Sequence, residues 1–127
     1  MASRDRQALA RFGEDLAARF LHRRGWEIHA RNVRTPAGEI DIVARDGDTW
    51  VFVEVKTRRS TAWGWPEEAV TPGKWRRLYQ AALHWLEDRG QPEDVTWRID
   101  VVAIVVGRGR PQIRHFEGVD YGPETLE

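Results

Sequence analysis

The sequence predicts an α/β protein, a mixed sheet flanked by helices, organised as a single domain over residues 1–127. Three observations indicate this class: a helical pattern opens the chain, three strand-like stretches follow it, and a second helical pattern precedes a strand that is apolar on both faces. Elements in this order form a sheet with helices packed on it. A chain of 127 residues also buries enough surface to fold without a disulfide or a structural zinc ion.

Helices are expected at residues 5–24 and 72–89, and each is followed by a glycine that ends the pattern. Apolar residues recur at spacings of three and four in the first helix: Leu9, Phe12, Leu16 and Phe20. The second helix has an apolar stripe made of Leu78, Ala81, Ala82, Trp85 and Leu86. Each helix is therefore expected to pack one face against the sheet.

Strands are expected at residues 26–33, 39–45, 49–57, 96–106 and 112–116. The first should end before the turn at Thr35, and Asp46-Gly47-Asp48 should join the second and third as a hairpin. Strand 96–106 is apolar on both faces after Asp100, which predicts a strand covered on each side. Asp100 itself is expected to form a structural pair with Arg98.

The composition excludes several classes of protein. The chain has no Cys, which rules out zinc fingers, thiol nucleophiles and redox sites. No apolar run approaches the ~18–20 residues of a membrane span, and no secretory signal is visible, so a cytoplasmic protein without membrane contact is expected. The net charge is zero, but residues 1–77 hold 15 basic against 11 acidic residues while residues 78–127 hold 5 against 9. The more basic first part is weak support for an anionic partner.

Lysine is rare in this chain. Of the 20 basic residues 18 are Arg, and the only lysines are Lys56 and Lys74. A lysine kept against this bias suggests a need for a compact ammonium group that can lose its proton, which Arg cannot do. The alternative for either lysine is chance.

Strand 49–57 places charge at the end of an apolar stretch. Trp50, Phe52, Glu54 and Lys56 share one face, and valines occupy the other. A carboxylate and an ammonium group in this position are costly unless they are paired, exposed or functional.

The hairpin brings a second carboxylate to this face. If Gly47-Asp48 is the loop, Asp41 lies directly opposite Glu54; if Asp46-Gly47 is the loop, Asp41 is a diagonal neighbour on the same face. A three-residue loop would instead put Asp41 and Glu54 on opposite faces. Facing carboxylates repel each other unless a cation joins them, and that cation is either Lys56 or a hard divalent ion such as Mg²⁺. The spacing leaves both alternatives open.

These residues also spell a known pattern. Gly38-Glu39-Ile40-Asp41, followed by Phe52-Val53-Glu54-Val55-Lys56, resembles the D…(D/E)-x-K signature of the PD-(D/E)XK nuclease superfamily. Further positions resemble the YraN-like family of small bacterial proteins: Gly13-Glu14, Asn32, Arg34, Arg58, Gly64, Lys74 and Arg98 to Val102. That family is placed in this superfamily and is similar in layout to archaeal Holliday junction resolvases. The resemblance implies a restriction endonuclease-like αβββαβ core.

The resemblance also implies roles for particular residues. Asp41 and Glu54 would be ligands of Mg²⁺ or Mn²⁺, Lys56 would orient or deprotonate the attacking water, and Glu14 would complete the metal site directly or through a water. Ile40 stands where the superfamily has its leading proline. Glu39 is expected to be a solvent-exposed strand charge.

The expected function is that of a Mg²⁺-dependent endonuclease acting on branched or structured DNA. Candidate nucleic-acid contacts are Arg34, Arg58, Arg59, Lys74 and Arg77, although Lys74 and Arg77 could also be plain helix-surface charges. Trp63 and Trp65 could stack on unpaired bases or cover core beneath their loop. Two other classes stay open: a nucleic-acid-binding module with a vestigial site, and a pure interaction protein. The oligomeric state is open as well, and a homodimer is allowed.

Overall fold

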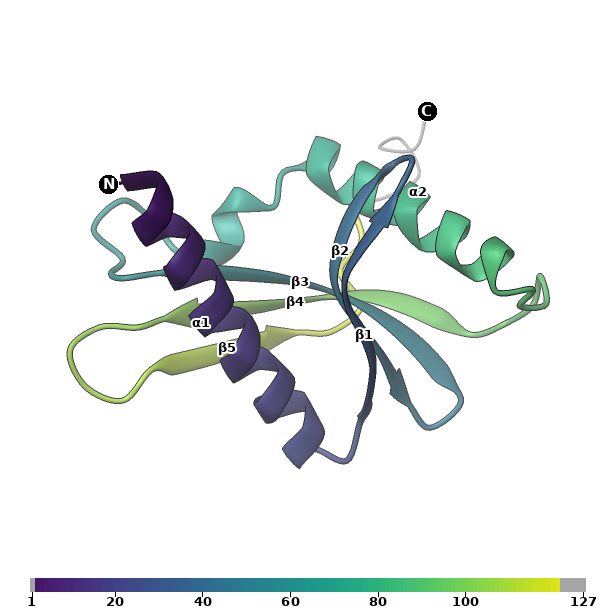
Figure 1. The fold of residues 1–127 in the computed structure, drawn as a ribbon, viewed down its shortest axis with the longest axis horizontal. Helices are drawn as coiled ribbons and strands as arrows, with labels where there is room; N and C mark the ends of the chain where they lie inside the picture. Colours follow the sequence, from purple (N-terminus) through teal and green to yellow (C-terminus); the bar gives the residue numbers. More distant parts are fainter. Residues whose placement is uncertain (1, 122–127) are drawn as a thin grey trace.

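The computed structural model describes residues 2–121 and contains two α-helices, five strands and one short 3-10 helix (Figure 1). The elements are α1 (Ala2–Arg23), β1 (Glu27–Thr35), β2 (Gly38–Asp46), β3 (Thr49–Arg58), η1 (Pro66–Ala69), α2 (Pro72–Asp88), β4 (Trp97–Val105) and β5 (Gln112–Phe116). Neither helix of the described residues has the length and apolar composition that crossing a membrane requires.

The strands form one mixed sheet in the order β1-β2-β3-β4-β5. Only β3 and β4 are parallel, and α2 forms the connection between them. The predicted α/β class is therefore confirmed, and the element order is compatible with a restriction endonuclease-like αβββαβ core. Several boundaries differ from expectation by one to three residues: α1 already begins at Ala2, and β1 continues through Thr35, whose Oγ1 accepts the backbone N–H groups of Ala37 and Gly38 and so closes the turn.

The two helices cover opposite faces of the sheet. The core under α1 contains Ala17, Leu21, Ile42, Ala44, Val51, Val53, Val102 and Ile104. The core under α2 contains Ile40, Val43, Trp50, Phe52, Leu78, Ala81, Trp85, Ile99 and Val101. Successive residues of β3 and β4 alternate between these cores. The prediction that the fourth strand is covered on each side is thus confirmed, and the even-numbered residues of β3 face α2.

The sheet opens where β2 leaves β3. Pairing between these strands stops at Ile42 and Val53, whereas β3 continues to pair with β4 as far as Arg58. Figure 1 shows the β1–β2 hairpin running across the other strands and ending beside α2. The second half of β3, residues 54–58, therefore has a neighbouring strand on one side only.

The divergence is centred on Asp41. Ile42 packs in the core under α1, but Ile40 packs in the core under α2, so the strand alternation breaks at the residue between them. Strand β1 is irregular at the same level, because Asn32 has a φ of 53°, a left-handed conformation that asparagine tolerates better than most residues.

Helix α1 approaches β3 closely at one point. A Cβ atom on Gly13 would stand 1.8 Å from the Oγ1 of Thr57 and 2.8 Å from its Cβ. Real Cβ atoms do not come so close to a neighbour, so the present distance between helix and strand requires glycine at position 13.

Replacing Gly13 with alanine is therefore expected to destabilise the protein by about 1–3 kcal/mol, although alanine is the better helix former. Gly73→Ala is the matched control, since a Cβ there meets nothing within 4 Å, and it should be neutral or stabilising. Thermal unfolding of both variants measures the difference. Thr57→Ala combined with Gly13→Ala should recover part of the loss, and simple addition of the two single losses would contradict the close-contact explanation.

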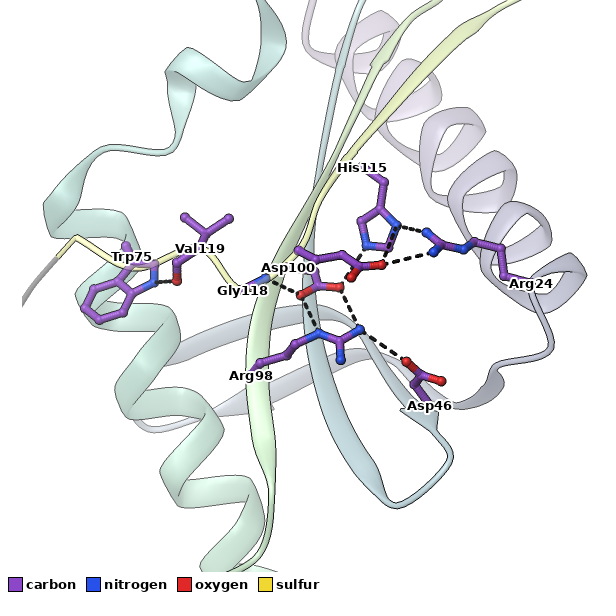
Figure 2. Close-up of polar contacts among 9 residues, drawn as sticks. Arg24, Asp46, Trp75, Arg98, Asp100, His115, Gly118 and Val119 are labelled. Atoms are coloured by element: carbon purple, nitrogen blue, oxygen red, sulfur yellow. Dashed lines mark hydrogen bonds and ion pairs between the residues drawn. The ribbon is translucent and has the colours of Figure 1, made fainter.

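The buried carboxylate of Asp100 links β4 to β5 and to the segment that follows β5 (Figure 2). Asp100 on β4 accepts hydrogen bonds from Arg98 Nε at 3.0 Å, His115 Nε2 at 2.8 Å and the Gly118 N–H at 2.9 Å. Burial alone would raise the pKa of Asp100, but the bonds from His115, Gly118 and Arg98 outweigh it and hold this pKa below its ordinary value. The predicted structural pair with Arg98 is confirmed, within a larger network.

Candidate active site

Asp41 and Glu54 meet at the point where β2 leaves β3. The hairpin pairs Asp46 with Thr49, so Gly47-Asp48 is the two-residue loop and the first of the three possible registers is the observed one. One position beyond the last β2–β3 pair, this register sets Asp41 opposite Glu54, close enough for the charge of Glu54 to raise the pKa of Asp41.

The side chain of Asp41 supplies a hydrogen-bond acceptor to β3 where the backbone of β2 no longer pairs with it. Its Oδ2 accepts the backbone N–H of Val55 at 2.8 Å, a group on the stretch of β3 that β2 no longer accompanies. Burial raises the pKa of Asp41 to about 8, and the negative charge of Glu54 adds to this effect; the Val55 N–H and the positive charge of Lys56 oppose it. The site therefore disfavours two ionised carboxylates unless further positive charge is supplied.

Lys56 lies on the same face as these carboxyl groups. Its Nζ is 3.5 Å from Oε1 of Glu54, and the two side chains are 28% and 21% exposed. The structure thus brings Asp41, Glu54 and Lys56 together, as the hairpin register predicts. One ammonium group beside two carboxylates still leaves a net negative charge when both carboxylates are ionised.

This arrangement fits a hard divalent cation. Mg²⁺ is commonly held by one or two carboxylates, with waters and substrate phosphate oxygens in its other positions. Asp41 and Glu54 supply two such groups from one face, and the pKa of Asp41 is raised first by burial and then by the negative charge of Glu54, an effect that a bound cation would oppose. Within residues 2–121, no three His, Asp or Glu side chains gather closely enough to form a metal-binding group by themselves. A bound ion would therefore need water or substrate oxygens as well.

Glu14 stands apart from this pair. Its buried carboxylate accepts Arg31 Nε at 2.9 Å and Asn32 Nδ2 at 3.0 Å, both from β1. Asn32 occupies the register position opposite Asp41. Glu14 thus holds Asn32, the left-handed residue beside the strand divergence, and any influence of Glu14 on Asp41 would pass through this residue of β1.

Glu14→Gln tests this indirect role. Glutamine keeps an oxygen that can accept the Asn32 amide, so the variant should bind Mg²⁺ within a few fold of wild type, whereas Glu14→Ala should weaken binding about tenfold or more, as losses of supporting contacts around metal sites do. Calorimetric titration of Mg²⁺ or Mn²⁺ into the two variants measures the difference. Equal losses in both would indicate that Glu14 is itself a ligand.

Basic side chains border the site. Lys74 and Arg77 lie on the exposed face of α2, and both line a cavity of about 170 Å³ together with Glu54 and Lys56. Both predicted helix cations are therefore placed where a phosphate next to the carboxylates could reach them.

Glu39 is a solvent-exposed charge on β2, as the sequence predicts, and it also lines the same cavity. Its side chain is half exposed and lies 4.0 Å from Arg34 Nε. The strand break at Asp41 gives the chain before it a different direction from that of a regular strand.

The other predicted nucleic-acid contacts are more dispersed. Arg58 and Arg59 lie at the end of β3, and neither takes part in an ion pair within residues 2–121. Arg34 lines a different and larger cavity, about 590 Å³, between the β1–β2 turn and the C-terminal half of α2. That cavity is lined by both cationic and anionic side chains, and neither Asp41 nor Glu54 is among them. The larger cavity is therefore not the candidate active site.

Comparison with known proteins places the chain in a family. Residues 13–104 match the family described as "Uncharacterised protein family UPF0102". A UPF0102 protein of Anaeromyxobacter dehalogenans (strain 2CP-C) is 51% identical over 111 residues, which cover 87% of this chain and 82% of the relative. Relatives from Rhodococcus jostii (strain RHA1) and Geobacter sulfurreducens (strain ATCC 51573 / DSM 12127 / PCA) are 52% and 53% identical, over 85% and 81% of this chain and 92% and 80% of their own length. The chain belongs to the UPF0102 family, the YraN-like family that its motifs indicate.

Proposed function

We propose that this protein is a cytoplasmic Mg²⁺-dependent endonuclease that hydrolyses phosphodiester bonds of branched or structured DNA. The observation that carries the proposal is the Asp41–Glu54 pair, with Lys56 beside it, at the opening of the sheet. Structural ion pairs also bring carboxylates and lysines together, but they do not require two facing carboxylates with only one cation.

Each residue of the site would have a separate role in phosphodiester hydrolysis. Asp41 and Glu54 would hold Mg²⁺ or Mn²⁺, and the bound ion would polarise the phosphate and make a water nucleophilic near neutral pH. Lys56 is placed to orient that water, or to take its proton once the ammonium group has released its own. Lys74 and Arg77 are placed to bind the phosphate oxygens and so to position the chain that is cut.

The proposed place of the protein is the PD-(D/E)XK nuclease superfamily. Two features support it: the αβββαβ element order, and the spacing of Asp41 and Glu54-Val55-Lys56 on neighbouring strands of a mixed sheet. Helix α2 connects the parallel strands β3 and β4 along the chain. Its basic N-terminal part therefore lies on the same face of the sheet as the carboxylates.

The test is cleavage by the purified protein of labelled single-stranded, duplex, nicked and four-way-junction DNA, with Mg²⁺, with Mn²⁺ and with EDTA. The proposal predicts metal-dependent cleavage of at least one branched or nicked substrate, with the activity lost in Glu54→Gln. Glu93→Gln is a matched control, because that carboxylate is exposed in the turn before β4 and belongs to neither the site nor the loop after β3. Activity that persists in Glu54→Gln would indicate a contaminating nuclease and would contradict the proposal.

A binding module with a vestigial site is the second candidate. It is favoured by the Glu54–Lys56 contact of 3.5 Å and by the lack of a third gathered ligand within residues 2–121. This candidate predicts tight binding to one of the same substrates with no cleavage in either metal. The substrate panel therefore separates the two functions in one experiment.

Binding to DNA should depend steeply on salt in either case. Neutralising phosphates releases condensed counterions, so the logarithm of the binding constant falls linearly with the logarithm of the salt concentration. Lys74→Ala and Arg77→Ala should each flatten this slope by roughly one unit. Fluorescence anisotropy between low and moderate salt measures the slope, and an affinity that stays flat over this range would exclude these residues as phosphate contacts.

A further inference from the structure

One large aromatic side chain is left almost entirely in solvent. Trp63, in the loop between β3 and η1, is 90% exposed, more than any other exposed large apolar residue in the described part of the chain. The sequence allowed two interpretations for the tryptophans of this loop, base stacking or core cover. For Trp63 the exposure excludes core cover.

The loop holds Trp63 in this position by specific contacts. Ser60 Oγ accepts the N–H of Ala62, and the carbonyl of Thr61 accepts the N–H of Gly64, at 3.3 Å and 3.0 Å. Gly64 has a φ of 108°, which suits glycine and lets the chain turn back directly after Trp63. The turn thus places Trp63 and Trp65, two residues apart, in different environments.

Trp65 shows the contrast. Arg114 lies over its ring at 4.4 Å and is itself paired with Glu67 at 2.7 Å, and the Trp65 N–H donates to Glu68. Trp65 is therefore tied to the body of the protein by its ring and by its backbone. The same contacts anchor the loop end that follows Trp63 and leave the Trp63 ring facing outward.

The loop follows directly after β3, the strand that carries Glu54 and Lys56. Val106 and Gly107 donate backbone hydrogen bonds to the carbonyls of Arg58 and Arg59, each at 2.9 Å, so β3 stays extended up to the loop. At ~3.3 Å per residue, Arg59 lies about 10 Å beyond Lys56 along the strand. Arg58 has the same parity as Lys56 and so faces the same side of the sheet. The order from the site outward is therefore lysine, two arginines and an exposed tryptophan.

We propose that Trp63 stacks on an unpaired base of the nucleic-acid strand whose phosphate lies at Asp41 and Glu54. The inference rests on the proposed function and extends it by naming the substrate class: a strand with unpaired bases a few nucleotides from the bond that is cut. Cations that follow the backbone, combined with an aromatic face for the bases, form the usual surface for single strands. A base paired within a duplex has no free face to offer, so the contact selects branched, gapped or frayed DNA.

The test is binding of fluorescein-labelled DNA in EDTA at low salt, where cleavage does not occur. The probes are a single strand, a blunt duplex and a duplex with a single-stranded overhang. Trp63→Ala should weaken binding to the single strand and to the overhang by about 5- to 100-fold and leave blunt-duplex binding within about twofold. Trp63→Phe should keep most of the affinity. Trp63→Leu, apolar but without a ring face, should behave like Trp63→Ala.

A second readout locates the contact. Removing one base at a time from the overhang should weaken binding by wild type at one position, and that loss should disappear in Trp63→Ala. Equal affinities of wild type and Trp63→Ala for all probes would overturn the inference, as would a failure of wild type to bind the single strand. A Trp63-dependent overhang preference without metal-dependent cleavage would support the stacking contact and contradict only the proposed nuclease activity.

Discussion

Lys56→Arg is expected to reduce the rate of DNA cleavage by roughly two orders of magnitude or more, the loss typical of removing a general base, while the melting temperature stays near that of wild type. The guanidinium group keeps the positive charge beside Glu54, so the ion pair at 3.5 Å can be re-formed. It is larger than an ammonium group, however, and it does not lose its proton in proteins. Arginine at position 56 therefore keeps the positive charge but loses the ability to take a proton from the attacking water.

The comparison with Lys56→Met makes the result decisive. If Lys56 only balances the two carboxylates, arginine should preserve both cleavage and stability, and methionine should impair both. If Lys56 acts on the attacking water, arginine and methionine should be similarly slow. Cleavage rates and melting temperatures of the two variants, on the best substrate of the panel, distinguish these outcomes. Normal cleavage by Lys56→Arg would contradict the catalytic assignment.

Hairpin geometry explains why the centre of the site was predictable from sequence. Once Asp46-Gly47-Asp48 is identified as a turn, only a few registers exist, and the period of two along each strand decides which side chains share a face. Two of the three registers brought Asp41 and Glu54 together, and the observed Asp46–Thr49 pair is the first of them. Local rules therefore sufficed for this part of the site.

The rest of the site depends on contacts between residues far apart in sequence. The strand break at Asp41 follows from packing of Ile40 against α2 and from the conformation of Asn32, which Glu14 holds through its side chain. Periodicity carries no information about such contacts. This is why the sequence predicted neither the position of Glu39 in the cavity nor the attachment of Glu14 to β1.

The exposure of Trp63 is similarly beyond sequence reasoning. Trp63 and Trp65 are two residues apart in one irregular loop, and nothing in their spacing separates them. The separation arises because Arg114 of β5 covers one ring, a contact between segments about 50 residues apart in a sequence of 127. Tertiary contacts therefore set how far each ring is exposed, 41% for Trp65 against 90% for Trp63.

Asp41→Asn is expected to stabilise the metal-free protein, and the advantage should increase as the pH rises from 5 to 8. The sign follows from the raised pKa of Asp41, about 8 against an ordinary 3.8. Over this interval the folded protein retains a proton that the unfolded chain releases, so wild type loses stability with increasing pH, by at most about 1.4 kcal/mol per unit from this group. Asparagine imitates the protonated form and can still accept the Val55 N–H, so this contribution disappears from the variant.

At pH 8, adding Mg²⁺ should make the wild-type protein more stable than Asp41→Asn. A cation that binds the folded wild type raises its stability in proportion to the logarithm of the metal concentration above the dissociation constant, whereas Asp41→Asn has lost one of the two carboxylates and should gain much less. Thermal unfolding of both proteins across this pH range, first in EDTA and then in Mg²⁺, measures both effects. Asp48→Asn is the matched control, because it removes the same charge from an exposed position in the hairpin turn. A stability difference between wild type and Asp41→Asn that is independent of pH, or equal stabilisation of both by Mg²⁺, would show that Asp41 does not share a cation site with Glu54.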